Sequence, residues 1–183
     1  MNSYIANPLE FIITTLFSLY ILAVMLRFLL GVVRADFYNP ISQFLVRITN
    51  PLLIPLRKIL PGFGKIDVAS IVLMLVLSVA MLLVIVLLRG TGVSVLPLLL
   101  MAVGELVMLA INVFLVAIIV QVIISWINPG SYNPVNALLD SLTAPILRPI
   151  QRIIPALSGI DLSPLFALIG LQVLKMLLQP LLA

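Results

Sequence analysis

The sequence contains no cysteine and no histidine, and only 9% of its 183 residues are charged. Without these two residue types there is no disulfide, no thiol nucleophile, no haem ligation through either side chain and almost no common zinc site. The side chain that most often transfers protons near neutral pH is also missing. An enzyme needs a convergent set of acid, base or nucleophile, and the residue inventory supplies none. We therefore expect neither an enzyme nor a bound cofactor or metal.

The shortage of charged residues also indicates that lipid, and not water, surrounds much of the protein. A soluble domain carries about 25% charged residues, whereas this chain is 63% hydrophobic, so lipid must cover much of its surface. Four apolar segments reach the roughly 20 residues that a spanning helix needs. We expect residues 95–103 to approach the third span along the interface, because the whole apolar stretch overshoots one bilayer. The predicted fold is an all-α polytopic membrane protein with four transmembrane helices, at residues 11–33, 69–88, within 95–127, and 165–183.

The chain contains an internal repeat. Residues 38–67 align without a gap on residues 132–161, with twelve identities in 30 positions. Paired prolines and polar residues are hard to reproduce by a chance match of two apolar stretches, so the duplication is real. We assign the repeats to residues 1–92 and 93–183, each a span, an amphipathic loop and a span, in parallel orientation. The repeated loop motif comprises Tyr38, Asn39, Pro40, Thr49, Pro51, Pro55, Pro61 and Asp67, and then Tyr132, Asn133, Pro134, Thr143, Pro145, Pro149, Pro155 and Asp161.

Positive charge predicts the orientation. The two long loops carry seven Lys and Arg residues, whereas the opposite side carries only Arg89. Cytoplasmic loops are enriched in these residues. We therefore expect both long loops in the cytoplasm and both termini outside. The short connection between the second and third spans contains Gly90 and Gly92, which are expected to end a helix and permit a tight reversal.

Each loop is predicted to begin with an amphipathic helix. Asn39 and Asn133 suit the residue that caps a helix, and the prolines that follow suit the first helical position. Apolar residues then recur at spacings of three and four, which forms one stripe. Because the helix is too short to span, we expect it to lie in the interface. The stripe is Ile41, Phe44, Leu45, Ile48 and Leu52, or Val135, Leu138, Leu139 and Leu142; opposite it lie Ser42, Gln43 and Arg47, or Asn136, Asp140 and Ser141.

The Thr-x-Pro-x-x-x-Pro run is expected to break this helix, with threonine bonding to backbone groups freed by the break. A second short amphipathic piece should follow and end at Pro61 or Pro155, and Asp67 or Asp161 should cap the next span. Two arrangements remain open: broken helices on the membrane surface, or a re-entrant hairpin whose broken backbone lines a polar site. The first is favoured by basic residues that suit lipid phosphates, namely Arg57, Lys58, Arg148 and Arg152.

Ionisable residues within spans are costly, which makes them functional candidates. Arg27 lies near the cytoplasmic end of its span and can snorkel to the interface, and its repeat partner Gln121 is also polar. Glu105 is expected near the outer headgroups, as is Glu10. Lys175 falls near the middle of the fourth span. We hypothesise that it pairs with Glu105 or Glu10, or lines a polar path, with Asn112, Gln121 and Gln172 available as hydrogen-bonding partners.

The doubled Tyr-Asn-Pro, Thr-x-Pro-x-x-x-Pro, Pro, Ile-Asp pattern between apolar spans resembles the YggT family of bacterial and plastid membrane proteins, over nearly the whole chain. Copy two has Ser125-Trp126 ahead of Asn128-Pro129, but copy one departs there, so any role of the tryptophan carries over only to Trp126. The resemblance implies a bacterial inner-membrane location and links to osmotic-stress tolerance, envelope organisation and cation (potassium) uptake. It brings no agreed molecular activity. The cytochrome maturation known for plastid relatives does not carry over as haem ligation, because histidine and cysteine are missing.

Two hypotheses follow. The first is a non-enzymatic scaffold or assembly factor that acts through its cytoplasmic amphipathic loops, which the scarcity of intramembrane charge favours. The alternative is a small cation (potassium) channel or transporter subunit, which would act as an oligomer because four spans make a thin bundle. The expected partners are the lipid bilayer, anionic lipid headgroups, and either a second copy or other membrane proteins; no nucleic acid is expected.

Overall fold

The computed structural model describes residues 3–60, 62, 66–90, 92, 94–127, 133–154 and 161–182. Within these residues the chain forms six helices. In order they are α1 (Ser3–Val32), α2 (Pro40–Ile59), α3 (Val68–Arg89), α4 (Val95–Ile127), α5 (Pro134–Ile153) and α6 (Ser163–Leu182).

Four of the described helices, α1, α3, α4 and α6, are long and apolar enough to cross a membrane. This confirms the prediction of an all-α polytopic membrane protein. The first span starts earlier than predicted, because α1 continues through Pro8 back to Ser3. The apolar stretch 95–127 is one continuous helix, α4, without a separate approach segment. Gly90 ends α3 in the left-handed conformation (φ 68°), as its place in the connection predicts.

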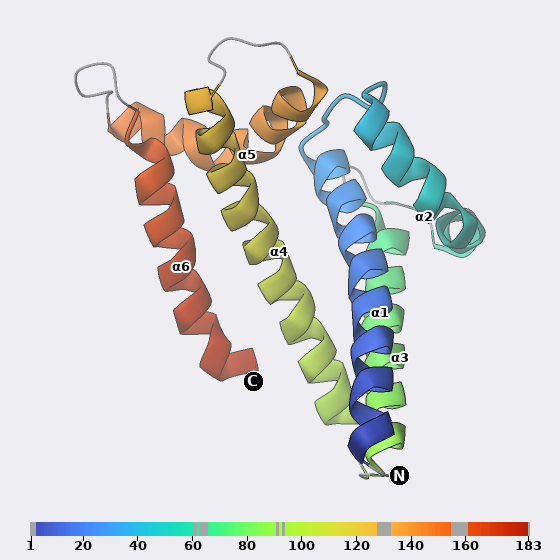
Figure 1. The fold of residues 1–183 in the computed structure, drawn as a ribbon. Coiled ribbons are helices and arrows are strands. Elements are labelled where there is room, and N and C mark those ends of the chain that lie inside the picture. Colours follow the sequence, from blue (N-terminus) through green and yellow to red (C-terminus); the bar gives the residue numbers. More distant parts are fainter. Residues whose placement is uncertain are drawn as a thin grey trace.

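The two repeats place equivalent elements at equivalent ends of the molecule. Figure 1 shows α2 and α5 together at one end, with both termini toward the other. In the first repeat α2 contacts both α1 and α3, and in the second α5 contacts both α4 and α6. The repeats meet where α3 packs on α4 and where α1 and α2 contact α5. Each loop helix is therefore fastened to the two spans of its own repeat.

One main core joins the two repeats. It is built around α1, whose Val24 and Met25 are buried, and it includes residues of α2, α3, α4 and α5. A smaller core of Ile118, Leu147 and Ala167 joins α4, α5 and α6. Because lipid tails are as apolar as leucine, close packing and polar contacts between helices hold such a bundle together.

The loop helices are unbroken, which corrects the prediction that the proline run ends the first helix. Pro51 and Pro55 lie inside α2, and Pro145 and Pro149 lie inside α5. Interior proline removes one backbone hydrogen bond and bends a helix without always ending it, and α2 is visibly curved in Figure 1. The segment expected as a second amphipathic piece is the last turn of the same helix. The broken backbone, which both arrangements assumed, is therefore wrong for the described residues; Pro61 and Pro155 lie outside them.

The apolar stripe of α2 does not pack as one face. Leu45 is buried against the spans, but Phe44 is 60% exposed and Leu52 is 45% exposed. Ser42, predicted on the opposite side, is buried. The helix is rotated from the predicted position because Thr49 has a partner on α1, so the buried row follows Ser42, Leu45, Thr49 and Leu53. Ile48 and Leu56 also pack against the core. The apolar side chains of α2 that remain exposed, which suits contact with lipid, are Ile41, Phe44, Leu52, Ile54 and Ile59.

Candidate functional site

The loop helices begin as predicted, and their starts also join the repeats. The Asn39 side chain accepts a hydrogen bond from the Ile41 N–H (2.9 Å), and Asn133 accepts one from the Val135 N–H (3.0 Å). In addition, Asn39 Nδ2 donates to the carbonyl of Pro134 (2.7 Å). Sequence reasoning missed this last bond, because it depends on how the repeats pack. Tyr38 is 88% exposed, and Tyr132 lies outside the described residues.

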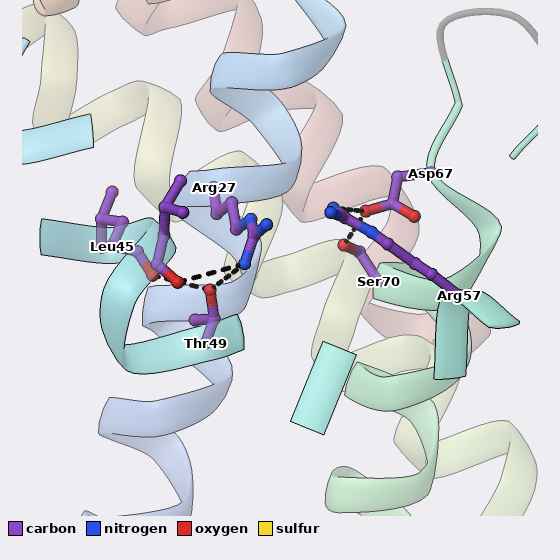
Figure 2. Close-up of polar contacts among 7 residues, drawn as sticks. Arg27, Leu45, Thr49, Arg57, Asp67 and Ser70 are labelled. Atoms are coloured by element: carbon purple, nitrogen blue, oxygen red, sulfur yellow. Dashed lines mark hydrogen bonds and ion pairs between the residues drawn. The ribbon is translucent and has the colours of Figure 1, made fainter. Parts of the chain in front are cut away.

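A polar contact between the first span and the loop helix occurs in both repeats. Arg27 is buried, with 7% of its surface exposed, and its Nη1 donates to Thr49 Oγ1 (2.5 Å; Figure 2). The same Nη1 donates to the carbonyl of Val46 (3.4 Å). At the same place in the second repeat, Gln121 Oε1 lies 2.6 Å from the Thr143 hydroxyl. Arg27 is therefore turned into the protein and not toward water, which corrects the snorkelling interpretation.

Both threonines also donate to the carbonyl four residues earlier, that of Leu45 (2.6 Å) or Leu139 (2.8 Å). The prediction that they bond to groups freed by proline is wrong, since Pro51 frees the carbonyl of Arg47. Donors from α1 act near this point instead: the Tyr20 hydroxyl donates to the carbonyl of Ile48 (3.3 Å), and Arg27 reaches Val46. These side-chain donors fasten α2 to α1 just before the proline.

A second repeated contact fastens the end of each loop helix to the start of the next span. Arg57 forms a 2.5 Å ion pair with Asp67, which also accepts from the Ser70 hydroxyl (2.6 Å; Figure 2). In the second repeat Gln151 donates to Asp161 (2.9 Å). Asp161 also caps its helix by accepting from the Ser163 N–H (2.8 Å), whereas the Asp67 carboxylate makes no such backbone bond.

The electrostatics of these two carboxyl groups follow from their partners. Burial acts to raise the pKa of Asp67, but hydrogen bonds from Arg57 and Ser70 outweigh it and hold that pKa below its usual value. Burial also opposes ionisation of Asp161, and the bonds from Ser163 and Gln151 lower its pKa. Both carboxylates are thus kept charged to hold helices together, which leaves neither in the protonation state of a general acid.

The third repeated contact lies between the two spans of each repeat. Ser18 Oγ donates to Met81 Sδ at 3.9 Å in the first repeat, and Lys175 Nζ donates to Asn112 Oδ1 at 2.8 Å in the second. Lys175 occupies the place of Met81, and Asn112 that of Ser18. The hypothesis that Lys175 pairs with Glu105 or Glu10 is therefore wrong, and Asn112 is its partner.

The two glutamates have different surroundings. Glu10 forms a two-pronged ion pair with Arg89, through both Nε and Nη2 of the arginine, which ties the start of α1 to the end of α3. Sequence reasoning missed this pair, although the sequence held a signal for it. Arg89 directly follows the second predicted span, and Glu10 directly precedes the first, so two neighbouring antiparallel spans bring them to the same end. Glu105 lines a cavity of ≈ 280 Å³ between α1, α3 and α4, together with Ser18, Ser78 and Asn112.

The four predicted headgroup contacts are all exposed. Arg57 is engaged by Asp67, and Lys58 lies in the last turn of α2. Arg148 and Arg152 line an open hollow where α5 approaches the end of α1 at Val33. Gln121, besides its contact with Thr143, donates to Asp140 (2.7 Å), so it takes no part in a network with Lys175.

These features define a polytopic α-helical membrane protein made of two tandem span–loop helix–span units. Its sequence belongs to the CCB3/YggT family, whose model matches the chain twice, at residues 6–88 and 100–182. Relatives include an uncharacterised protein of Pseudomonas aeruginosa, 48% identical over 91% of this chain and 86% of its own length, and the uncharacterised protein YggT of Escherichia coli K12, 37% identical over 93% and 88%. An uncharacterised protein of Vibrio alginolyticus is 41% identical over 91% of this chain and 90% of its own length. No solved structure matches the chain.

Proposed function

We propose that this protein is a non-enzymatic protein of the bacterial inner membrane that supports envelope organisation or membrane-protein assembly during osmotic stress. Its working surface is the pair of loop helices α2 and α5, which face the cytoplasm, while both termini lie outside. The expected partners are anionic lipid headgroups and membrane proteins.

The observation that carries this proposal is the fixed presentation of the two loop helices. Each is joined to the span before it through a buried threonine and to the span after it through an aspartate, and both lie at the same end of the molecule. Their outward sides remain rich in large or charged groups, including Phe44 and Arg47 on α2 and Arg148 and Arg152 on α5. A rigidly held surface of this kind suits binding better than chemistry.

The orientation rests on charge. Arg47, Arg57, Lys58, Arg148 and Arg152 belong to the two loop helices, whereas the opposite end carries Arg89, which Glu10 neutralises. Juxtamembrane basic residues are attracted to the anionic cytoplasmic leaflet by about 1 kcal/mol each. The case against catalysis also rests on chemistry: the chain has no histidine or cysteine, and Glu10, Asp67 and Asp161 are held in contacts between helices.

Growth at high osmolarity tests this proposal in a strain lacking the protein. The wild-type gene is expected to restore growth, and the Arg148→Gln/Arg152→Gln double variant is expected to fail at equal membrane abundance, because it removes charge from the exposed side of α5. Arg89→Gln is the control, since it removes the same kind of charge at the opposite end. Full rescue by the double variant, or failure of the control alone, contradicts a working surface on the loop helices.

A second candidate function, a small cation channel or transporter subunit, is favoured by the cavity between α1, α3 and α4. Ser18, Ser78, Glu105 and Asn112 line it with hydroxyl, carboxylate and amide oxygens, and hard cations prefer oxygen ligands. Potassium flux into liposomes that contain the purified protein tests this function. Flux that Glu105→Gln abolishes supports the channel, and flux no greater than in protein-free liposomes rejects it.

Self-association is a further part of the proposal, because α6 is poorly suited to lipid. It is the least hydrophobic and the least buried of the four candidate spans. Gln172 lies near its middle and is exposed, although the repeat-equivalent Ser78 is buried beside α4. In the first repeat the equivalent helix is α3, and α4 covers its corresponding face. Because α1 is the repeat equivalent of α4, the α1 helix of a second copy would cover α6 in the same way.

A further inference from the structure

A cavity between α1, α2 and the start of α3 concentrates positive charge. It measures ≈ 470 Å³, and its lining includes Arg27, Arg34, Arg57 and Asp67. The single carboxylate among these residues, that of Asp67, is already engaged by Arg57 and Ser70. Arg27 and Arg34 therefore contribute charge that no acidic group of the cavity lining balances.

Arg27 is the buried cationic side chain of this cavity. Only 7% of its surface is exposed, yet its partners are neutral: the Thr49 hydroxyl and the Val46 carbonyl, both contacted through Nη1. No carboxylate lies within 4.0 Å of its guanidinium in the described part of the chain. A buried arginine remains charged and costs several kcal/mol when unpaired. A bound anion would offset that cost.

Arg34 reaches the cavity from a strained position. It follows α1 in the left-handed conformation (φ 55°), and the turn is closed by bonds from the Arg34 N–H to the Gly31 carbonyl (3.1 Å) and from the Ala35 N–H to the Leu30 carbonyl (2.9 Å). Glycine usually occupies this position after a helix. An arginine there costs about 1 kcal/mol in backbone strain, which its place beside Arg27 and Arg57 would explain.

The second repeat shows that the fold does not require these arginines. The residues at the equivalent positions are Gln121, Asn128 and Gln151, all neutral. Gln121 still contacts Thr143, and Gln151 still contacts Asp161. The same helix contacts are therefore made without arginine, and the three arginines add something specific to the first repeat.

From this arrangement we infer that the cavity binds the phosphate group of an anionic ligand. Guanidinium groups match phosphate oxygens with paired N–H donors, and Nη2 and Nε of Arg27 make no bond to a described residue. The cavity lies beside α2, at the end of the spans where lipid phosphates are found if α2 lies in the interface. The phosphate belongs to a lipid headgroup or to a free anion. This inference goes beyond the scaffold role and does not depend on it.

Thermal unfolding of the full-length protein in neutral detergent tests the site. The probes are phosphatidylglycerol and inorganic phosphate, compared with phosphatidylcholine and with sodium chloride at equal ionic strength. We expect one probe to raise the Tm of the wild type. Arg27→Gln should need a roughly tenfold higher concentration of that probe for the same rise in Tm, because it loses a charged hydrogen bond. A response to phosphatidylglycerol alone identifies a lipid headgroup, and a response to inorganic phosphate identifies a free anion.

Two further variants make the result decisive. Arg34→Asn introduces the residue of the second repeat at an exposed position, so it tests the site even if Arg27→Gln does not fold. Arg89→Gln removes an equal charge at the opposite end of the molecule, outside both the cavity and the loop helices, and is expected to respond like the wild type. The inference is overturned if neither probe raises the wild-type Tm above its comparison, or if Arg89→Gln loses the response as fully as the cavity variants do.

Discussion

Thr49 and Thr143 occupy equivalent positions in the two repeats, but the side chains that they contact on the preceding span differ in charge. Thr49 accepts from the buried guanidinium of Arg27, whereas Thr143 contacts the neutral amide of Gln121. Both threonines are completely buried. Removing the partner of a buried charge costs more than removing the partner of a buried amide.

Thr49→Val should therefore destabilise the protein more than Thr143→Val, although each change keeps the side-chain shape. We expect a loss of about 2 kcal/mol for Thr49→Val and about 1 kcal/mol for Thr143→Val. Unfolding of the purified variants in the same detergent measures both values. Equal losses would show that Arg27 does not depend on Thr49.

Asp67 makes the stability depend on pH. Its pKa is lower in the folded protein than in the unfolded chain, so its contribution is present at neutral pH and is lost as the pH falls through the folded value. That window lies below about pH 4, the ordinary range for aspartate. The wild type should lose stability there more steeply than Asp67→Asn, in unfolding curves recorded between neutral and acidic pH. Parallel curves for the two proteins would exclude a stabilising ion pair with Arg57.

At the scale of elements, the sequence predicted the spans and the starts of the loop helices better than it predicted the ends of the loop helices. The four spans follow from apolar runs, and the starts of α2 and α5 follow from Asn39-Pro40 and Asn133-Pro134, because both signals are local. The proline run misled, since its effect depends on neighbours that only the folded chain supplies. Tyr20 and Arg27 donate to carbonyls just before Pro51, and the helix continues.

The prolines of α2 are expected to shape the helix, and substitution should straighten it. In the Pro51→Ala/Pro55→Ala variant the missing N–H groups return. The distance between Gln43 and Lys58 should then approach roughly 22 Å, the value for a straight helix of this length. The wild-type distance should be shorter. Pulsed EPR between spin labels at these two exposed positions measures the change. An unchanged distance would mean that contacts with α1 and α3, and not the prolines, set the curvature.

At the scale of the molecule, the repeat alignment indicated which residues share an environment but not which of them touch. Every repeated contact lies between positions that the alignment pairs, as Arg27–Thr49 and Gln121–Thr143 illustrate. The partner choice depends on how far each loop helix turns about its axis, which no local pattern encodes. The arginine cavity escaped sequence reasoning for the same reason: Arg57 is distant in the chain from Arg27 and Arg34, and only the packing of α2 on α1 brings it to them.

Self-association through α6 predicts a specific cross-link, which a chain without cysteine allows to be tested cleanly. Ser78 and Asn112 line one cavity at the junction of the repeats, so the corresponding contact between two copies pairs Gln172 with Ser18. Co-expressed Gln172→Cys and Ser18→Cys chains should form a disulfide-linked dimer in membranes. Val116→Cys, on an exposed part of α4, should not link to Ser18→Cys. Equal linking of both pairs, or of neither, would contradict this mode of association.

The central claim is that α2 and α5 form a working surface on the cytoplasmic side, and single-cysteine accessibility tests it most directly. The variants are Gln43→Cys on α2 and Arg152→Cys on α5, with Val95→Cys at the start of α4 as the opposite-side reference; all three positions are exposed. A maleimide that cannot cross membranes should label the first two in inverted inner-membrane vesicles but not in spheroplasts, and the third with the reverse pattern. Labelling of Gln43→Cys and Arg152→Cys in spheroplasts would contradict the account.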